Sequence, residues 1–302
     1  GREAAGLHEM GIYEHLDLVY DNKMLGEGPE FETRLSKFYV NLYGRMDDTQ
    51  KKIWDAHYVP ILEEFKTSKW AGEDLAQWKY NRYMRDYLGT IQSVDDGVGQ
   101  VLDYLKRNGL EENTLVVYTS DQGFYLGEHG WFDKRFMYEE SFRTPILMRF
   151  PKKIKAGTVV DQMVQNLDFA PTFLDLAQVP IPKDMQGESL VPLMGGEAPK
   201  DWRDAIYYTY YEYPSEHNVN RHYGVRTDRY KLIHFYYEVD QWELYDLEKD
   251  PQEMHNVYGN PEYGDIQEQM HKKLEEVRLK YKDSDANNKS FLDEYLQARK
   301  DG

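Results

Sequence analysis

The residues best suited to chemistry in this sequence lie between positions 114 and 135, in the run TLVVYTSDQGFYLGEHGWFDKR. Asp121 and Gln122 offer two neighbouring oxygen ligands, the donor type that hard cations such as Ca²⁺ and Mg²⁺ prefer. His129 and Lys134 follow, five residues apart, as donors to an anionic group. The pattern indicates a site in which one metal ion and nearby cations bind the same anion. Taken alone, Asp-Gln-Gly after a strand is also typical of a simple turn.

A short, β-branched apolar run at residues 114–120 precedes Asp121 and predicts a buried strand. Strand ends in α/β domains commonly bind ligands, because side chains there leave the sheet and face a crevice. A second buried strand is expected at residues 144–150, and a further strand at 159–165. Asp168 is expected to cap a helix at residues 169–177.

An apolar stripe at helical spacing predicts one long helix from about residue 75 to about residue 107. With the strand at 114–120 it forms half of an α/β unit. Asp95 and Asp96 lie inside this helix and are either metal ligands or part of a solvated face. Their position in the middle of the helix favours the solvated face. Residues 30–65 are also helical in pattern, and Pro60 is expected to break or kink them.

The character of the chain changes after a connection rich in proline and glycine at residues 178–202. Short aromatic and β-branched runs follow without intervening helices, which predicts an antiparallel sheet. The expected strands are 205–211, 223–227, 230–237 and 242–247, with a tight turn at 227–229 and a helix at about 266–281. We therefore expect one part at residues 1–200 and a smaller one at 201–302.

Composition limits the class of protein. The chain has 302 residues, no cysteine and a net charge of −17, so cysteine nucleophiles, cysteine-ligated zinc and disulfides within it are excluded. The negative charge disfavours nucleic acid and anionic membranes as partners, although a locally basic pocket remains compatible with an anionic substrate. There is neither an apolar run long enough to span a membrane nor a signal-peptide pattern, which indicates a cytosolic protein or a leader absent from this sequence.

Several long motifs resemble the type I, formylglycine-dependent sulfatases of the alkaline-phosphatase superfamily. They include SDQGFYLGEHGWFDKRFMYEESFRTPILMRFP, YLGTIQSVDDGVGQVLDYL, NLDFAPTFLDLAQV, MQGESLVPLMGG, HYGVRTDRYKLIHFY and WELYDLEKDPQEMHNV. Within this family, the motifs most resemble those of enzymes that remove 6-O-sulfate from N-acetylglucosamine in glycosaminoglycans. The resemblance implies a partial α/β/α sandwich with a smaller C-terminal antiparallel sheet and helix. It also implies a sulfated carbohydrate as substrate and a periplasmic, secreted or lysosome-like location.

The resemblance assigns roles to individual residues. Asp121 and Gln122 match two Ca²⁺ ligands, with Mg²⁺ as the alternative ion; the family more often has Asn at the second position. Lys134 matches the lysine that contacts the sulfate and its bridging oxygen, and His129 is implied to shape the catalytic pocket. Arg221 and His222 are implied to reach the sugar; the other interpretation is an exposed polar pair.

One departure from the family is large. The family's Cys/Ser-x-Pro-x-Arg segment, which supplies the formylglycine nucleophile, has no match in these 302 residues, and neither do its N-terminal metal aspartates. We therefore expect a truncated sulfatase that does not hydrolyse sulfate esters alone, and that associates with a missing half or with itself through exposed packing surface. Two other hypotheses stay open: a phosphatase or phosphodiesterase relative on the same fold, and a non-catalytic glycan-binding remnant.

Overall fold

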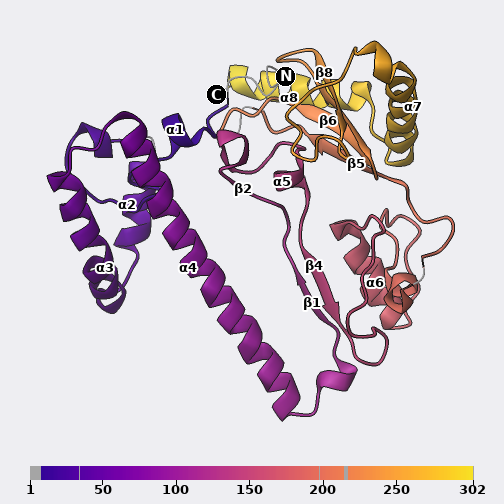
Figure 1. The fold of residues 1–302 in the computed structure, drawn as a ribbon, viewed down its shortest axis with the longest axis horizontal. Helices are drawn as coiled ribbons and strands as arrows, with labels where there is room; N and C mark the ends of the chain where they lie inside the picture. The colour runs from indigo at the N-terminus through magenta and orange to yellow at the C-terminus, as the bar shows by residue number, and fades with distance from the viewer. Residues whose placement is uncertain (1–7, 34, 197, 214–216, 302) are drawn as a thin grey trace. The chain divides into compact units, whose positions relative to one another are not determined.

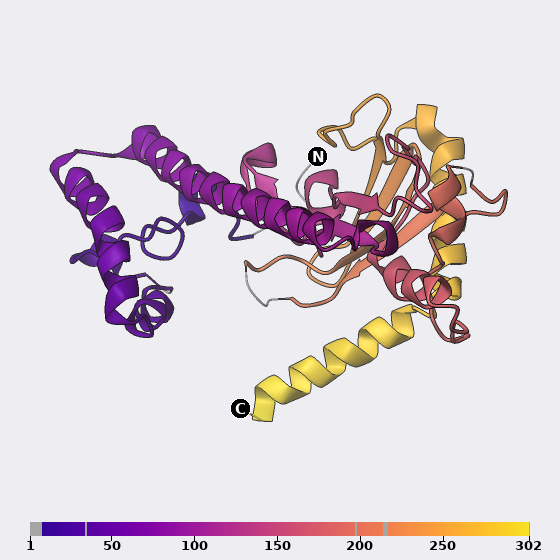
Figure 2. The ribbon, with the colours of Figure 1, turned by 90° about the horizontal axis from the view of Figure 1, so that it is seen from below.

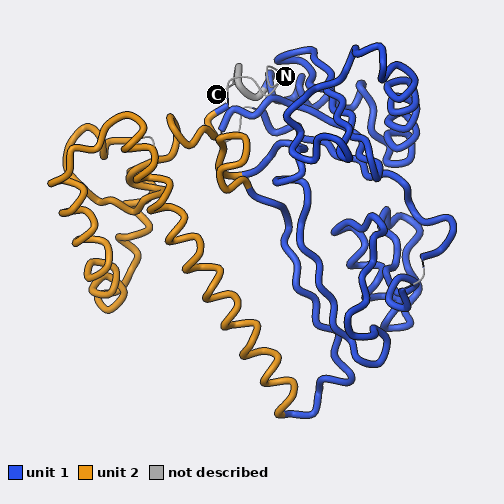
Figure 3. The backbone as a smooth tube through the Cα atoms, in the orientation of Figure 1, with its two compact units in different colours: residues 1–8, 108–124, 134–302 blue, residues 9–107, 125–133 orange. Residues whose placement is uncertain are grey.

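The computed structural model describes residues 8–33, 35–196, 198–213 and 217–301 (Figure 1). The chain forms two compact units, coloured separately in Figure 3. The first comprises residues 1–8, 108–124 and 134–302, and the second comprises residues 9–107 and 125–133. The boundaries between these units do not fall at residue 200. The predicted boundary at residue 200 refers to the larger fold of the family, and it stays a prediction.

The second unit is mainly helical. Its elements are α1 (Ile12–His15), η1 (Pro29–Phe31), α2 (Ser36–Gly44), α3 (Asp48–Thr67), α4 (Gly72–Arg107), β2 (Tyr125–Leu126), η3 (Glu128–Gly130) and β3 (Phe132–Asp133). The short strands β2 and β3 pair with each other, antiparallel. An apolar core collects side chains from η1, α2, α3 and the loop that precedes η1, including Leu18, Met24, Phe31, Tyr39 and Leu62.

Helix α3 continues through Pro60, so the predicted break there is wrong. The helix begins with a reciprocal capping box, in which Asp47 and Gln50 each accept a hydrogen bond from the other's backbone amide. Beyond the proline, Leu62 is buried and Phe65 packs against Trp78. Because most helical stability in proteins comes from packing of this kind, burial offsets the hydrogen bond that the proline removes.

Helix α4 confirms the long helix that the apolar stripe predicted. Many of the stripe's side chains are nevertheless exposed, among them Leu88, Ile91, Val94 and Val101. Asp95 and Asp96 are exposed too, as a solvated face requires. No helix in the described part of the chain combines the length and apolar character needed to cross a bilayer.

The first unit contains a two-stranded ribbon of β1 (Val116–Thr119) and β4 (Ile146–Arg149), which pair antiparallel after η2 (Glu111–Asn113). Both strands were predicted, but their predicted burial is wrong, because Tyr118 is exposed and Leu147 is 66% exposed. Within the described residues these two strands pair only with each other. Association through such exposed apolar side chains stays a prediction.

The C-terminal part of this unit contains a four-stranded antiparallel sheet. The strands β5 (Ala205–Tyr210), β6 (His222–Thr227), β7 (Tyr230–Phe235) and β8 (Gln241–Asp246) are neighbours in chain order, as predicted. The other elements are α5 (Glu139–Phe142), η4 (Asn166–Asp168), α6 (Phe169–Leu176), η5 (Val191–Gly195), η6 (Pro261–Tyr263), α7 (Gly264–Lys280) and α8 (Asp285–Asp301). The strand expected at 159–165 is absent from the described structure.

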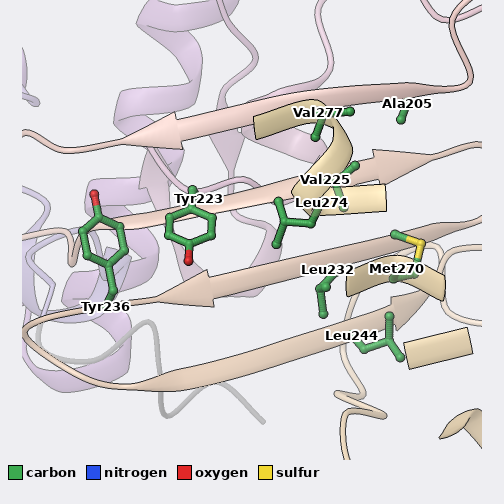
Figure 4. Close-up of a cluster of buried hydrophobic side chains, with 9 residues drawn as sticks. All are labelled: Ala205, Tyr223, Val225, Leu232, Tyr236, Leu244, Met270, Leu274 and Val277. Atoms are coloured by element: carbon green, nitrogen blue, oxygen red, sulfur yellow. The ribbon is translucent and has the colours of Figure 1, made fainter. Parts of the chain in front are cut away.

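Helix α7 packs on the sheet and forms its core. Met270, Leu274 and Val277 of the helix meet apolar side chains of all four strands, with Tyr236 beside them (Figure 4). Helix α8 follows α7 and runs in a different direction (Figure 2). Helix α7 has a highly charged sequence and is therefore buried only along the face that packs on the aromatic sheet, as its sequence indicates.

Asp168 does not cap α6 with its side chain, contrary to the expectation. Its fully buried carboxylate instead accepts hydrogen bonds from the guanidinium of Arg203, which is also buried, and from the backbone amides of Gln165 and Glu188. A buried charge needs such partners, and the distant arginine outcompetes the local cap.

Glu243 of β8 is buried and accepts hydrogen bonds from the hydroxyls of Tyr138 and Tyr245, each 2.8 Å long. Burial raises the pKa of Glu243 to about 7. Between the unfolded pKa and this value the folded chain holds a proton that the unfolded chain releases. The stability that this group contributes is therefore present at low pH and is lost as pH rises towards 7.

We predict that Glu243→Gln removes this dependence. The free energy of unfolding of the wild type should fall by roughly 2–3 kcal/mol relative to the variant between pH 5 and pH 8. Urea unfolding of the wild type and the variant across this pH range measures the change. Subtracting one free energy of unfolding from the other cancels the contribution of the other titrating groups. Parallel stability curves would contradict the prediction.

Candidate functional site

Asp121, Gln122 and Lys134 line one cavity of about 710 Å³ in the first unit. The two metal-ligand candidates follow the end of β1, and Lys134 begins the segment that leads to α5. Residues twelve positions apart in the sequence thus face a common space. Their assigned roles remain predictions.

Gly123 holds the turn that carries Asp121 and Gln122. Its backbone N–H donates to the carbonyl of Ser141 over 2.8 Å. A Cβ atom at this position would lie 2.1 Å from the carbonyl oxygen of Glu140, closer than any real contact. Only glycine lets the turn lie directly against α5.

Replacing Gly123 with alanine is therefore expected to destabilise the chain by about 1–3 kcal/mol, the usual cost of overpacking. Thermal or urea unfolding measures the loss. Gly99→Ala is the matched control, because a Cβ there meets no atom within 4 Å in the exposed part of α4; this change should be neutral or stabilising by up to about 1 kcal/mol. Equal stability of the Gly123 variant and the wild type would refute the expected clash.

Ser141 joins the two sides of the site. Its carbonyl accepts from Gly123, and its Oγ accepts from the backbone N–H of Arg135 over 2.9 Å. The carbonyl of Arg135 in turn accepts from the hydroxyl of Tyr208 over 2.6 Å. Arg135 has a φ of 112°, a backbone conformation that is costly for a non-glycine residue and persists only where surrounding contacts impose it. These bonds fix the segment that carries Lys134.

Sequence reasoning missed three further cations of this cavity, Arg135, Arg143 and Arg226. Arg135 lies 3.8 Å from a carboxylate oxygen of Glu212, and Arg226 lies 3.4 Å from one of Glu139. Arg226 comes from β6, so its position depends on the folding of the sheet. With Lys134, they give the cavity a cationic side suited to an anionic ligand.

The donor set only partly fits a metal ion. Asp121 and Gln122 supply the oxygen donors that a hard divalent cation prefers, but Ca²⁺ takes about six to eight oxygens. Within the described residues there is no group of three or more His, Cys, Asp or Glu side chains arranged to hold a metal. The two residues would therefore provide a fraction of a coordination sphere.

His129 belongs to the second unit, where η3 places it in a left-handed conformation with φ of 59°. Its ring stacks on that of Trp131, with centroids 5.2 Å apart, and meets Tyr125 edge-on. Gly127 and Gly130, with positive φ, flank it. A packed imidazole in a tight turn is consistent with shaping a pocket, and its catalytic role stays a prediction.

Arg221 and His222 are not an exposed polar pair, since both are buried. The guanidinium of Arg221 forms an ion pair with Glu238 and donates to the carbonyl of Tyr213. His222 is enclosed by the rings of Phe136, Tyr208, Tyr210 and Phe235. Burial lowers the pKa of His222 to about 4, which makes it neutral at pH 7. Their contact with a sugar stays a prediction.

A family model described as Sulfatase matches residues 27–179, and one described as N-sulphoglucosamine sulphohydrolase, C-terminal, matches residues 127–280. The chain is 47% identical over 292 residues to the N-acetylglucosamine-6-O-sulfatase of Bacteroides thetaiotaomicron. This alignment covers 96% of this chain and 52% of that protein. The chain therefore spans about half the length of this relative.

Solved structures agree. One described as a complex with its substrate D-glucosamine-2-N,6-O-disulfate matches with a TM-score of 0.86 and 47% identity, covering 94% of this chain and 58% of that one. The phosphonate monoester hydrolase of Silicibacter pomeroyi matches with a TM-score of 0.62 and 26% identity, covering 70% and 43%. The predicted fold, part of an alkaline-phosphatase-like α/β domain, is thereby confirmed. The chain belongs to the sulfatase family of the alkaline-phosphatase superfamily.

Proposed function

We propose that this chain forms part of a sulfuric ester hydrolase that removes sulfate from a sulfated sugar of the N-acetylglucosamine-6-sulfate type. The observation that carries the proposal is the single cavity shared by Asp121, Gln122 and Lys134. The relative with 47% identity has the printed name N-acetylglucosamine-6-O-sulfatase, which supports the sugar and the position of the sulfate.

The chemistry of the cavity suits this ester. A sulfate monoester is an anion, and its hydrolysis places more negative charge on the leaving oxygen. Lys134, assisted by Arg135 and Arg226 at the same cavity, would bind the sulfuryl oxygens and stabilise that charge. Sulfatases bind a divalent metal ion; we propose Ca²⁺, or alternatively Mg²⁺, held in part by Asp121 and Gln122, which supplies positive charge beside the sulfate.

The other assigned residues complete the proposal. The family motif supports a catalytic role for His129 and contacts of Arg221 and His222 with the sugar. By resemblance to the family, the location would be periplasmic, secreted or lysosome-like, and fractionation that recovers the protein in the cytosol would contradict it.

Calorimetric titration of the 302-residue chain with N-acetylglucosamine-6-sulfate tests the proposal. We expect binding in the presence of Ca²⁺, weaker binding after chelation by EDTA, and no measurable binding of unsulfated N-acetylglucosamine. Equal affinity for the two sugars would overturn the sulfate-directed function. No binding of either would overturn it as well.

A phosphoryl-transfer relative is the alternative on this fold, because a phosphonate monoester hydrolase is among the structural matches. Phosphatases and phosphodiesterases of this fold commonly use two transition metals with histidine ligands, whereas Asp121 and Gln122 offer oxygen donors for one hard cation. A phosphonate monoester in the same titration separates the two. Tighter binding of the phosphonate than of the sulfated sugar would favour the alternative.

A further inference from the structure

A second cavity, of about 340 Å³, lies beside β5 in the first unit. Alternate residues of β5 face different cavities, as strand geometry requires. Tyr208 and Tyr210 line the cavity that contains Lys134, whereas Thr209 and Tyr211 line the second cavity. Tyr207 and Gln165 line both, so the two cavities adjoin along the edge strand of the sheet.

Aromatic rings make up much of the second cavity. Tyr207 stacks with Tyr281, with centroids 6.3 Å apart and planes 15° apart, and Tyr211 stacks with Phe291 at 5.9 Å and 26°. Phe291, on α8, is 53% exposed, and Tyr211 is exposed as well. Large rings that remain open to solvent at a cavity offer flat apolar surface to a ligand.

Polar groups in the same cavity lack partners. Asn288 of α8 is only 6% exposed, yet its side-chain Nδ2 has no hydrogen-bond partner among the described residues. A buried donor left unpaired costs free energy, so such groups usually have a ligand or water as partner. Lys282 lines the cavity and forms no ion pair within the described part of the chain, whereas Asp283 accepts from Tyr207 and lies 3.6 Å from Arg278.

We propose that this second cavity binds a further sugar residue of the same glycan whose sulfated residue enters the Lys134 cavity. The inference rests on the proposed function. The C–H faces of a pyranose ring pack on aromatic rings, and its hydroxyls pair with amides such as Asn288. Lys282 suits a sugar that carries a carboxylate or sulfate, which selects an acidic oligosaccharide over a neutral one.

Titration of the 302-residue chain with two ligands tests the proposal. The ligands are N-acetylglucosamine-6-sulfate and a disaccharide that links it to a hexuronic acid. We expect the disaccharide to bind roughly tenfold more tightly. Phe291→Ala and Tyr211→Ala should each remove most of this gain and leave the monosaccharide affinity unchanged. Lys282→Gln should reduce the gain for the acidic disaccharide more than for one that ends in a neutral sugar.

Leu296→Ala is the matched control, since Leu296 is also an exposed apolar residue of α8 but does not line the cavity. Thermal unfolding of each variant confirms that folding is retained. Equal affinity for monosaccharide and disaccharide would overturn the second sugar site while leaving the proposed function in place. A gain that survives both aromatic substitutions would overturn it too. No binding of either ligand would overturn the proposed function and, with it, this inference.

Discussion

Replacing Lys231 with methionine is expected to lower the free energy of unfolding by roughly 3–5 kcal/mol. Lys231 is fully buried in β7, and its ammonium group lies 2.8 Å from Glu139 and 2.7 Å from Glu253. It also donates to the carbonyl of Met137 over 2.8 Å. Without the lysine, the buried Glu253 loses its counter-charge and Glu139 keeps the more distant Arg226, which is the costly way to break a buried ion pair.

Urea unfolding measures this loss. Lys272→Met is the matched control, because its ion pair with Glu268 on α7 is exposed and should contribute at most about 1 kcal/mol. A triple variant that combines Lys231→Met with Glu139→Gln and Glu253→Gln should recover much of the stability, since it removes the charges together. A loss below about 1 kcal/mol for Lys231→Met alone would contradict the ion-pair argument.

The second large effect is expected on binding. Lys134→Ala should weaken the affinity for N-acetylglucosamine-6-sulfate by roughly 10- to 100-fold, because a hydrogen bond to a charged group contributes about 1.5–3 kcal/mol. Lys134→Arg keeps the charge and should lose less. Calorimetric titration with each variant measures the change.

Lys153→Ala is the control for net charge, because Lys153 lies on an exposed turn outside the cavity. Its affinity should match the wild type. If Lys134→Ala binds the sulfated sugar within twofold of the wild type, then Lys134 does not contact the sulfate, and the assignment taken from the family motif fails for this residue.

Local patterns predicted the C-terminal sheet well. The four strands from Ala205 to Asp246 form where short aromatic and β-branched runs predicted them, and Thr227 to Arg229 form the expected turn. Burial of β1 and β4 could not be predicted in this way. A β-branched run indicates a strand, but whether its faces are covered depends on neighbours that the local sequence does not specify.

The residues of the candidate site also differ in how far the local sequence could predict them. Asp121, Gln122 and Lys134 were predictable because a compact motif carries them within fourteen residues. Arg226 and Ser141 were not, because they reach the site only through the sheet and α5. Asp168 shows the same limit, since its buried arginine partner lies 35 positions away and overrides a plausible local cap.

The alternation of β5 constrains how this protein can diverge. Apart from Tyr207, which lines both cavities, its odd-numbered and even-numbered side chains supply two different linings, so a single inserted or deleted residue at the start of the strand would exchange them. Substitutions along the strand can change one lining and leave the other intact. Ligand preference on this scaffold can therefore drift by point replacement, whereas changes in the length of this strand would scramble both recognition surfaces together.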